Sequence, residues 1–270
     1  MIRMILIDMD GTCLNTFKRI SKKNLEAMKM LQTYGVTVVP ASGRAMHSLP
    51  KAVFEDPSFR YVMTSNGARL TDRDSGEIIF REEITPEESR QLLDLINDMP
   101  VTVGVQAGGR YYLHGGRIEN MIGGFAFASD LEQVTMCDDL LEHVDAAGGA
   151  EKFSLFYHHP GIRNQVTERI RSQMHLRISK GFIYSEVCSE KAGKGNALKA
   201  LQEHLHIAKE ECACIGDGDN DITMFENCGL RFAPQNACRD IREMADHIVS
   251  DNDHDCVWEA VRIMMEQKCI

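Results

Sequence analysis

The sequence predicts an α/β protein: a doubly wound, mostly parallel, Rossmann-like sheet into which a separate α+β module is inserted. Two short apolar runs, residues 4–7 and 213–215, are each followed directly by an acidic turn that contains glycine. Such runs are typical of buried strands, and open parallel sheets bind ligands at the carboxyl ends of their strands. Strands and helices alternate in the first and last parts of the chain but not in the middle. The two outer parts are therefore expected to form one sheet.

The first part predicts strands at residues 4–7, 36–39 and 61–64. Between the first two strands, Ser21 is suited to begin a helix and Gly35 is suited to end it. This strand, helix, strand order is the repeating unit of a parallel sheet.

The pattern changes after the third strand. Residues 69–72 and 77–82 flank a Gly-containing turn and predict an antiparallel hairpin. Thr85, Pro86 and Glu88 predict a capping box at the start of a helix. Further strands are expected at 101–106, 110–114 and 152–157 and near Leu176 and Ile183, with a helix after Pro160. We assign residues 83–186 to the inserted α+β module.

The α/β pattern returns at Gly193, where Ala197, Leu198, Leu201 and Leu205 predict an amphipathic helix. A strand at 212–215 and a helix after Asp219 follow. Residues 1–82 and 187–270 therefore complete one sheet domain.

Composition excludes several classes of protein. The chain has 270 residues, 43% hydrophobic and 26% charged, as in ordinary globular proteins of one large or two smaller domains. A net charge of −10 without a strongly basic stretch argues against nucleic-acid binding. No apolar run approaches the ~18 residues that span a bilayer, so no membrane partner is expected. The 9 cysteines are odd in number and contain no C-x-x-C pair, which favours reduced thiols and a cytoplasmic location.

The first acidic turn contains Asp8 and Asp10, two residues apart and followed by Gly11. On an extended backbone their side chains point the same way, and the glycine allows the chain to turn tightly around a bound group. One carboxylate can then attack a substrate while the other handles protons. The alternative interpretation of this pattern alone is a capped surface turn.

The second acidic turn contains Asp217, Asp219, Asn220 and Asp221. One of these acids is expected to cap the following helix, Asp217 is the predicted metal ligand, and Asp219 is expected to be solvated. Carboxylates from two turns that meet in a poorly solvated pocket repel one another, and a hard cation such as Mg²⁺ relieves that repulsion.

Two further positions are suited to a phosphate. Ser42 and Gly43 follow the second strand and offer a hydroxyl and backbone N–H groups, although Ser42 could instead cap a helix. Lys194 lies at the start of a helix, which is unfavourable for a cation unless an anion binds there. Lys191 is its rival, and a solvated lysine is the alternative for either.

Together, D-x-D-G-T at residues 8–12, Ser42, K-G at the start of a later helix and G-D-x-x-N-D at residues 216–221 are similar to the four motifs of the haloacid dehalogenase superfamily of phosphotransferases. The length, the turn at residues 65–67 and the large insertion resemble the Cof-type class of sugar-phosphate phosphatases. The resemblance covers essentially the whole chain. It implies a catalytic core with an inserted cap, residues 83–186, that sets substrate specificity.

By this resemblance Asp8 would be the nucleophile that forms an aspartyl-phosphate, while Asp10 would protonate the leaving oxygen and then activate water. Asp8, Asp217 and the Asp10 backbone carbonyl would hold Mg²⁺, with Asp221 as a nearby anchor. The phosphoryl oxygens would be held by Ser42, Gly43, the catalytic Lys194, Asn220 and the backbone around Met9 and Gly11. The substrate would be a small phosphorylated metabolite.

The chain departs from the family pattern after the last sheet strand, where Pro234 and Gln235 precede Asn236 and Ala237 in place of the more usual Gly. Arg44 and Asn66 match family positions near the pocket. The alternatives are a phosphotransferase or mutase of the same fold and a non-catalytic sensor of a phosphorylated ligand. Oligomeric state and the identity of the metabolite are left open; six candidate contacts in the inserted module are His114, His158, His159, Arg110, Tyr111 and Tyr112.

Overall fold

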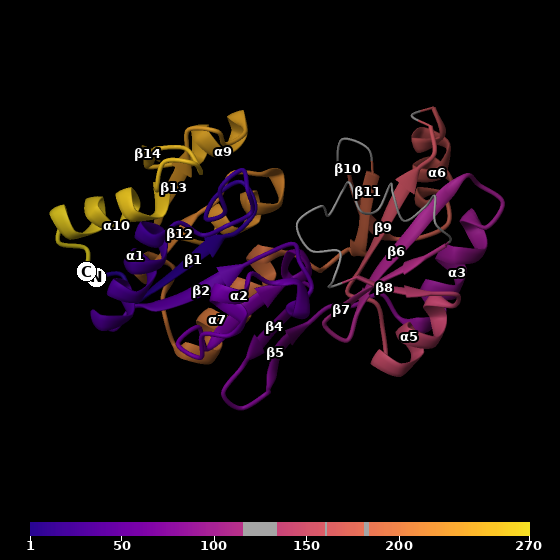
Figure 1. Cartoon of the computed structure of the whole chain (residues 1–270), viewed down its shortest axis with the longest axis horizontal. Coiled ribbons are helices and arrows are strands. Elements are labelled where there is room, and N and C mark those ends of the chain that lie inside the picture. The colour runs from indigo at the N-terminus through magenta and orange to yellow at the C-terminus, as the bar shows by residue number, and fades with distance from the viewer. Residues whose placement is uncertain (116–133, 160, 181–183) are drawn as a thin grey trace. The chain divides into compact units, whose positions relative to one another are not determined.

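The structure, a computed structural model, describes residues 1–115, 134–159, 161–180 and 184–270 (Figure 1). Its chain divides into two compact units. The first unit comprises Met1–Arg44, Leu49–Arg81 and Gly193–Ile270, and the second comprises Ala45–Ser48 and Glu82–Ala192. The expected boundary after residue 186 falls inside a strand, β11 (Tyr184–Ser189), because that strand continues its ladder with its neighbour to Ser189.

The first unit is built on an eight-stranded sheet with the order β14-β13-β12-β1-β2-β3-β4-β5. Strands β14 to β3 run parallel, and β4 and β5 add an antiparallel edge. The doubly wound, mostly parallel sheet predicted from the sequence is therefore confirmed. The strands are β1 (Met4–Asp8), β2 (Thr37–Ala41), β3 (Tyr61–Thr64), β4 (Arg69–Asp72), β5 (Ile78–Arg81), β12 (Cys212–Ile215), β13 (Leu230–Pro234) and β14 (His247–Val249).

Helices cover both faces of this sheet. Alternate residues of β1 point to opposite faces, so Met4 and Leu6 pack with α7, α8 and α9, while Ile5 and Ile7 face the other side. On that other side α1 packs against α10. The helices of the unit are α1 (Lys22–Thr33), α2 (Lys51–Phe54), α7 (Lys194–Leu205), α8 (Ile222–Phe225), α9 (Arg239–Met244) and α10 (Cys256–Glu266).

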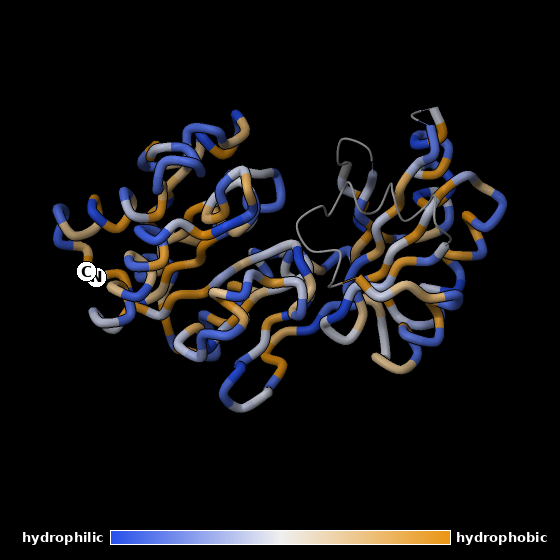
Figure 2. The backbone as a smooth tube through the Cα atoms, in the orientation of Figure 1, coloured by the Kyte–Doolittle hydropathy of each residue, from blue (hydrophilic) through white to orange (hydrophobic). Residues whose placement is uncertain are grey.

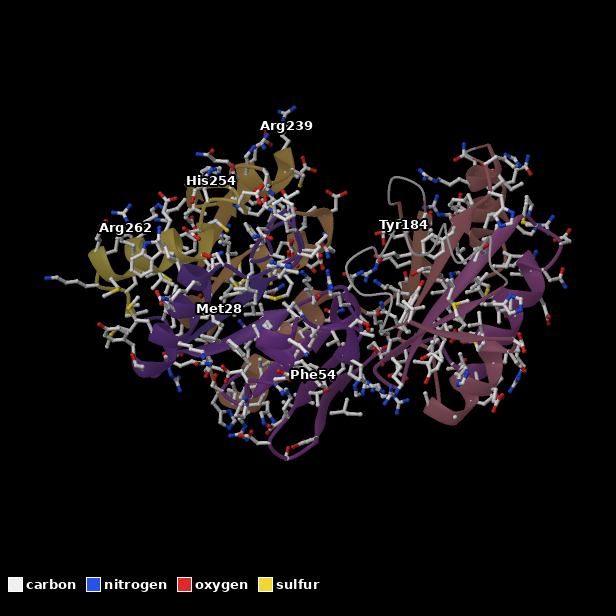
Figure 3. The ribbon with its side chains drawn as sticks, viewed as in Figure 1. Met28, Phe54, Tyr184, Arg239, His254 and Arg262 are labelled. Atoms are coloured by element: carbon white, nitrogen blue, oxygen red, sulfur yellow. The ribbon has the colours of Figure 1, made fainter. Side chains whose placement is uncertain are left out.

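The ends of α1 follow the sequence signals. The side chain of Ser21 accepts a hydrogen bond from the backbone of Asn24, and Gly35 adopts the left-handed conformation, with φ of 76°. Figure 2 shows hydrophobic residues along the central strands of the unit. In Figure 3, Met28 of α1 lies in the interior, whereas Arg239, His254 and Arg262 project from the outer segments, in agreement with their exposure.

The second unit has a six-stranded sheet with the order β10-β11-β9-β6-β7-β8. Its strands pair antiparallel except for β7 with β8. Besides β11, the strands are β6 (Val101–Ala107), β7 (Arg110–His114), β8 (Val134–Cys137), β9 (Lys152–Tyr157) and β10 (Leu176–Lys180). The capping box at Thr85 and Glu88 is confirmed, and β8 is a strand that the sequence did not reveal. Ile183 and Pro160 lie outside the described residues.

In the part of the second unit that the structure describes, three helices pack on one face of the sheet, burying Val103 and Val105 of β6 with Phe153 and Leu155 of β9. They are α3 (Pro86–Ile96), α5 (Leu140–Ala147) and α6 (Ile162–Arg171). Each unit therefore has its own hydrophobic core. Among the described residues, none of the helices is both long enough and apolar enough to cross a membrane.

Candidate active site

The candidate active site forms where β1, β2 and β12 end at the same edge of the first sheet. Asp8 is the last residue of β1 and pairs in register with Ala41, the last residue of β2. On the other side, Ile7 pairs with Ile215, the last residue of β12. Because these strands are parallel neighbours, the loops that follow them start side by side.

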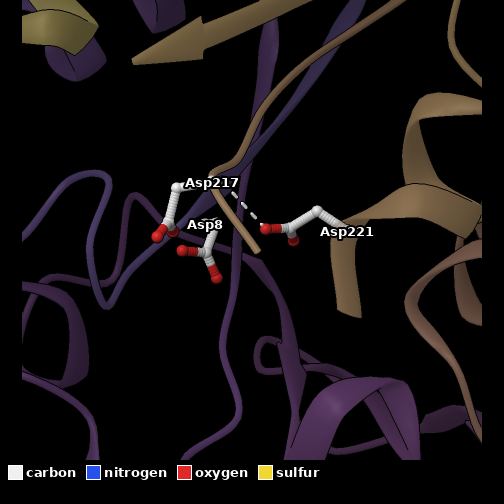
Figure 4. Close-up of side chains that lie close together, drawn as sticks. All are labelled: Asp8, Asp217 and Asp221. Atoms are coloured by element: carbon white, nitrogen blue, oxygen red, sulfur yellow. Dashed lines mark hydrogen bonds between the residues drawn. The ribbon is translucent and has the colours of Figure 1, made fainter. Parts of the chain in front are cut away.

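Three carboxylates converge at this edge. Asp8, Asp217 and Asp221 each place an oxygen within 4.8 Å of the others (Figure 4). Asp8 and Asp221 are buried, and Asp217 is partly buried. The second carboxylate oxygen of Asp221 accepts hydrogen bonds from the backbone N–H groups of Asp217 and Gly218, at 3.0 and 3.1 Å. Asp221 therefore both shapes the acidic turn and contributes to the cluster.

The two acidic loops touch one another directly. Thr12 donates from its hydroxyl to Oδ1 of Asp217 at 3.0 Å. Gly11 has a φ of 84°, and a Cβ atom at this position would lie only 2.4 Å from Oδ2 of Asp217. Glycine is therefore required at residue 11 both by the backbone conformation and by the close carboxylate.

Lys194 neutralises part of this negative charge. Its fully buried ammonium donates to Oδ1 of Asp8 at 2.5 Å and to Oδ1 of Asp221 at 2.6 Å. Burial opposes a charged lysine, but the charges of Asp221 and Asp8 outweigh it and raise the pKa of Lys194 above its usual value. An ammonium has three N–H donors, so Lys194 can donate a further bond.

The cluster remains short of positive charge. Burial raises the pKa of Asp8 well above its usual value, and the neighbouring Asp221 and Asp217 raise it further, against the opposing effect of Lys194. Burial and Asp221 likewise raise the pKa of Asp217. Three crowded carboxylates with oxygen donors are the ligand set that a hard divalent cation prefers. The residues present therefore fit Mg²⁺, which would relieve the repulsion between them.

The Asp10 carboxylate lies with two cations instead. Arg44 donates to both of its oxygens at 2.8 Å, and Lys18 forms an ion pair with it at 3.0 Å. Burial by itself would raise the pKa of Asp10, but the hydrogen bonds and charge of Arg44, with Lys18, lower it to about 2. Three of the four predicted metal residues, Asp8, Asp217 and Asp221, form the cluster. The fourth is Asp10, and its contact with the metal through the backbone carbonyl stays a prediction.

Ser42 and Asn220 are linked through a third residue, Asn66. The Ser42 hydroxyl accepts a hydrogen bond from the backbone N–H of Arg44 at 3.1 Å. The backbone carbonyl of Ser42 accepts one from the backbone N–H of Asn66 at 3.0 Å. Asn220 donates from its amide to Oδ1 of Asn66 at 2.9 Å. Ser42 thus closes a local turn rather than capping a helix, and its hydroxyl hydrogen can still be donated to a ligand. Asn66 has a φ of 57°, a conformation that asparagine tolerates better than most residues.

The other residues singled out in the sequence differ in how close they lie to the carboxylate cluster. Gly43 lies against Asn66, since a Cβ there would be 2.6 Å from its Oδ1, and Met9 is buried next to Asp8. Asp219 is exposed, as expected for a solvated residue. Lys191 is exposed and belongs to the second unit. The contacts made by Thr12, Lys18 and Asn236 were not inferred from the sequence, although Thr12 stands within the D-x-D-G-T motif itself.

Comparison with known proteins identifies the class to which this fold and site belong. The model of the family described as haloacid dehalogenase-like hydrolase matches residues 5–261, and the chain belongs to that family. The resemblance to the haloacid dehalogenase superfamily, inferred from four short motifs, and to its Cof-type class, inferred from the length, the turn at residues 65–67 and the insertion, is therefore confirmed.

Individual relatives match over nearly the whole chain. The phosphatase YwpJ of Bacillus subtilis is 27% identical, over 93% of this chain and 96% of its own length. The 5-amino-6-(5-phospho-D-ribitylamino)uracil phosphatase YcsE of the same organism is also 27% identical, over 97% and 95%. The crystal structure of TM0651 from Thermotoga maritima superimposes with a TM-score of 0.83 at 28% identity and covers 97% of each chain.

Proposed function

We propose that this protein is a Mg²⁺-dependent phosphatase that hydrolyses small phosphorylated metabolites through an aspartyl-phosphate intermediate. The observation that carries the proposal is the meeting of Asp8, Asp217 and Asp221 within 4.8 Å, with the ammonium of Lys194 2.5 Å from Asp8. The names of relatives such as YwpJ and YcsE, both phosphatases, support the reaction class.

In the first step a carboxylate oxygen of Asp8 attacks phosphorus, and the bond between phosphorus and the leaving oxygen breaks. Asp10 gives a proton to that oxygen, so the product leaves as a neutral alcohol. In the second step water attacks the phosphorus of the aspartyl-phosphate and passes a proton to Asp10. The bond to Asp8 breaks and inorganic phosphate forms. Asp8 is then a carboxylate again, and Asp10 carries the proton that it had before the first step.

The remaining residues bind and orient the phosphoryl group. Lys194 neutralises charge beside Asp8 and can donate to a phosphoryl oxygen; Ser42, Gly43, Asn220 and the backbone around Met9 and Gly11 complete the set. Asp8, Asp217 and the Asp10 backbone carbonyl would hold Mg²⁺, anchored by Asp221. When bound, the cation supplies positive charge against the phosphoryl oxygens.

Asp10 must change partners during this reaction. Both of its oxygens are occupied by Arg44, and with a pKa of about 2 it is ionised at neutral pH. Proton donation therefore requires the carboxyl to leave Arg44, so that the guanidinium no longer lowers its pKa, and to take up a proton from solvent before it turns to the leaving oxygen. Its ionised form is the one needed to accept a proton from water in the second step.

The second unit is proposed to act as the cap that selects the leaving group, with residues 83–186 as its predicted extent. Sugar phosphates and related phosphomonoesters are the proposed substrates. The name of YcsE, whose substrate carries a phosphorylated ribityl chain, is consistent with that class. A cytoplasmic location remains part of the proposal.

Replacement of the nucleophile tests the mechanism. Asp8→Asn is expected to lower kcat/KM for an aryl phosphate by at least about a thousandfold, because an amide cannot form the aspartyl-phosphate. Asp219→Asn, which changes an exposed acid of the G-D-x-x-N-D motif, is the matched control and should retain activity. Circular dichroism should show both variants folded.

Undiminished hydrolysis by Asp8→Asn would remove the mechanism. A panel of sugar phosphates, nucleotides and cofactor phosphates, assayed with Mg²⁺ and again with the metal chelated, identifies the substrate. Inorganic phosphate as the sole product, even with sugar acceptors present, would exclude a transferase or mutase.

A further inference from the structure

The turn that follows β13 contacts both acidic loops of the candidate site at once. The side-chain amide of Asn236 donates to the carbonyl of Gly11 at 2.7 Å. Two residues later, the backbone N–H of Cys238 donates to the carbonyl of Asp217 at 2.8 Å. Gly11 belongs to the loop that carries Asp8. A single short turn, residues 234–238, therefore holds the loop of the nucleophile and the loop of the second carboxylate.

The orientation of the Asn236 amide is fixed by a second loop. The backbone N–H of Asn252 donates to Oδ1 of Asn236 at 3.0 Å. A backbone N–H can only donate, so Asn236 must present its oxygen to Asn252 and its NH₂ group to Gly11. The side chain of Asn252 in turn donates to the carbonyl of Leu14 at 3.0 Å.

The peptide group between Gly11 and Thr12 is bound at both of its polar atoms. Its carbonyl, on Gly11, accepts from Asn236, and its N–H, on Thr12, donates to the carbonyl of Met9 at 3.4 Å. The Sγ of Cys256 contacts the next carbonyl, that of Thr12, at 3.2 Å. Successive carbonyls of the nucleophile loop are thus bound by side chains from two later segments of the chain.

Small movements of this loop would change the geometry of the carboxylates. Gly11 is so close to Asp217 that a single added carbon would overlap its carboxylate, and Thr12 is hydrogen-bonded to the same group. A displaced Gly11 carbonyl therefore moves the loop of Asp8 relative to Asp217. Phosphoryl transfer depends on such positions, since a misplacement of about 1 Å can lower a rate about a hundredfold.

We propose that Asn236 is a positioning residue that sets the separation between Asp8 and Asp217 through the carbonyl of Gly11. It acts through the backbone and needs no contact with substrate or metal. Residues that support metal ligands in this way typically change metal affinity or activity by about 10–100-fold when replaced. The inference rests on the proposed function, because it assigns Asn236 a role in the same reaction.

Replacement by alanine removes both hydrogen bonds of the side chain. Asn236→Ala is expected to lower kcat for an aryl phosphate by about 10–100-fold while KM changes by less than about threefold. The dissociation constant for Mg²⁺, measured by calorimetry on the substrate-free protein, should rise about tenfold. Asn252→Ala keeps its backbone bond to Asn236 and should have a smaller effect in the same direction.

Gln32→Ala is the matched control. Gln32 also donates from its side-chain amide to a distant carbonyl, that of Ser58 at 2.9 Å, and Ser58 precedes the amino end of β3, the edge opposite the site. A purely structural role predicts that Asn236→Ala and Gln32→Ala lower Tm alike and leave kcat and Mg²⁺ affinity unchanged.

If the wild-type protein is active, an unchanged kcat and an unchanged Mg²⁺ affinity in Asn236→Ala would overturn the inference. A change in the KM of Asn236→Ala alone would also overturn it. A wild-type protein without phosphatase activity would instead reject the proposed function. In that case Mg²⁺ affinity alone still decides the positioning role, because an unchanged affinity in Asn236→Ala contradicts it.

Discussion

Lys194 connects the chemistry of the site to the stability of the first unit. Its ammonium is fully buried between Asp8 and Asp221, and no exposed part of the side chain can be rehydrated in place. Removing one partner of a buried ion pair leaves the other charge without compensation, which destabilises proteins by about 3–5 kcal/mol. Lys194 is therefore expected to stabilise the first unit in the absence of metal, in addition to its proposed role in phosphoryl transfer.

Lys194→Gln in the presence of a chelator is expected to lower the free energy of unfolding by about 3–5 kcal/mol, measured by urea denaturation. Added Mg²⁺ should restore part of the loss, because the cation compensates the same carboxylates. Lys199→Gln, an exposed position on the same helix, should change stability little. Equal effects of the two substitutions would contradict the role assigned to Lys194.

Residues of the site differ in how well their positions and contacts can be predicted from the sequence. Asp8 and Asp217 were predicted because each lies in an acidic turn at the end of a short apolar run, so their placement depends on local pattern and on one rule about sheet edges. The ion pair of Asp10 with Arg44 was not predicted. It depends on how two loops 34 residues apart in sequence meet in space, and no local pattern carries that information.

At the scale of elements, a hydrogen-bonded ion pair joins the residue before β3 to the last residue of β4, at the antiparallel edge of the first sheet. Asp72, the last residue of β4, accepts from Arg60 at 3.0 and 2.7 Å and from the backbone of Asp74 at 3.0 Å. The hydrogen bond from Arg60 is the main reason that the pKa of Asp72 falls to about 2, below its usual 3.8. A carboxyl with a lowered pKa stabilises the fold above its ordinary pKa and loses that effect as the pH falls toward 2.

Arg60→Gln is therefore expected to lower the urea midpoint at neutral pH by a small amount, since Arg60 is half-exposed and its pair is screened by solvent. The difference from the wild type should persist down to about pH 4 and shrink between pH 4 and pH 2. Carbon NMR of the Asp72 carboxyl should show its pKa returning toward 3.8 in the variant. A difference in midpoint that does not vary over this pH range would show that Arg60 acts by packing alone.

Elements also differ in predictability for physical reasons. The capping box at Thr85 is local, since all of its hydrogen bonds join residues three apart, and it was predicted correctly. Strand β8 was missed because it has only four residues, Val134–Cys137, and such a short run gives little periodicity to recognise; its apolar Met136 is also exposed. Its stability comes from pairing with β7, which is a distant contact.

At the scale of the whole molecule, the expected insertion comprises residues 83–186, whereas the second compact unit comprises Ala45–Ser48 and Glu82–Ala192. Residues 45–48 belong to the second unit, although they follow β2 of the first. The backbone of His47 donates to the carbonyl of Gly109 at 2.9 Å, and this contact across 62 residues could not be inferred from periodicity. Local sequence patterns can predict strands and helices, whereas the assignment of this short segment depends on a contact between distant residues.

Separate cores predict separate responses to metal. The first unit contains the carboxylate cluster, and the second unit buries an independent set of side chains around Phe153 and Leu155. Mg²⁺ at about 100 times its dissociation constant would stabilise the first unit by about 2.7 kcal/mol, which corresponds to a rise in Tm of about 5–10 °C for a unit of this size. The unfolding transition of the second unit should not move.

The single tryptophan makes this measurable. Trp258 lies on α10, so its fluorescence reports the unfolding of the first unit, while scanning calorimetry reports every transition. With Mg²⁺, the fluorescence transition and one calorimetric peak should rise together, and Asp217→Asn should abolish the shift because it removes one carboxylate of the cluster. The same substitution should raise the Tm of the metal-free protein, since it relieves repulsion among buried carboxylates. A single calorimetric transition that shifts as a whole would instead show that the two cores unfold cooperatively.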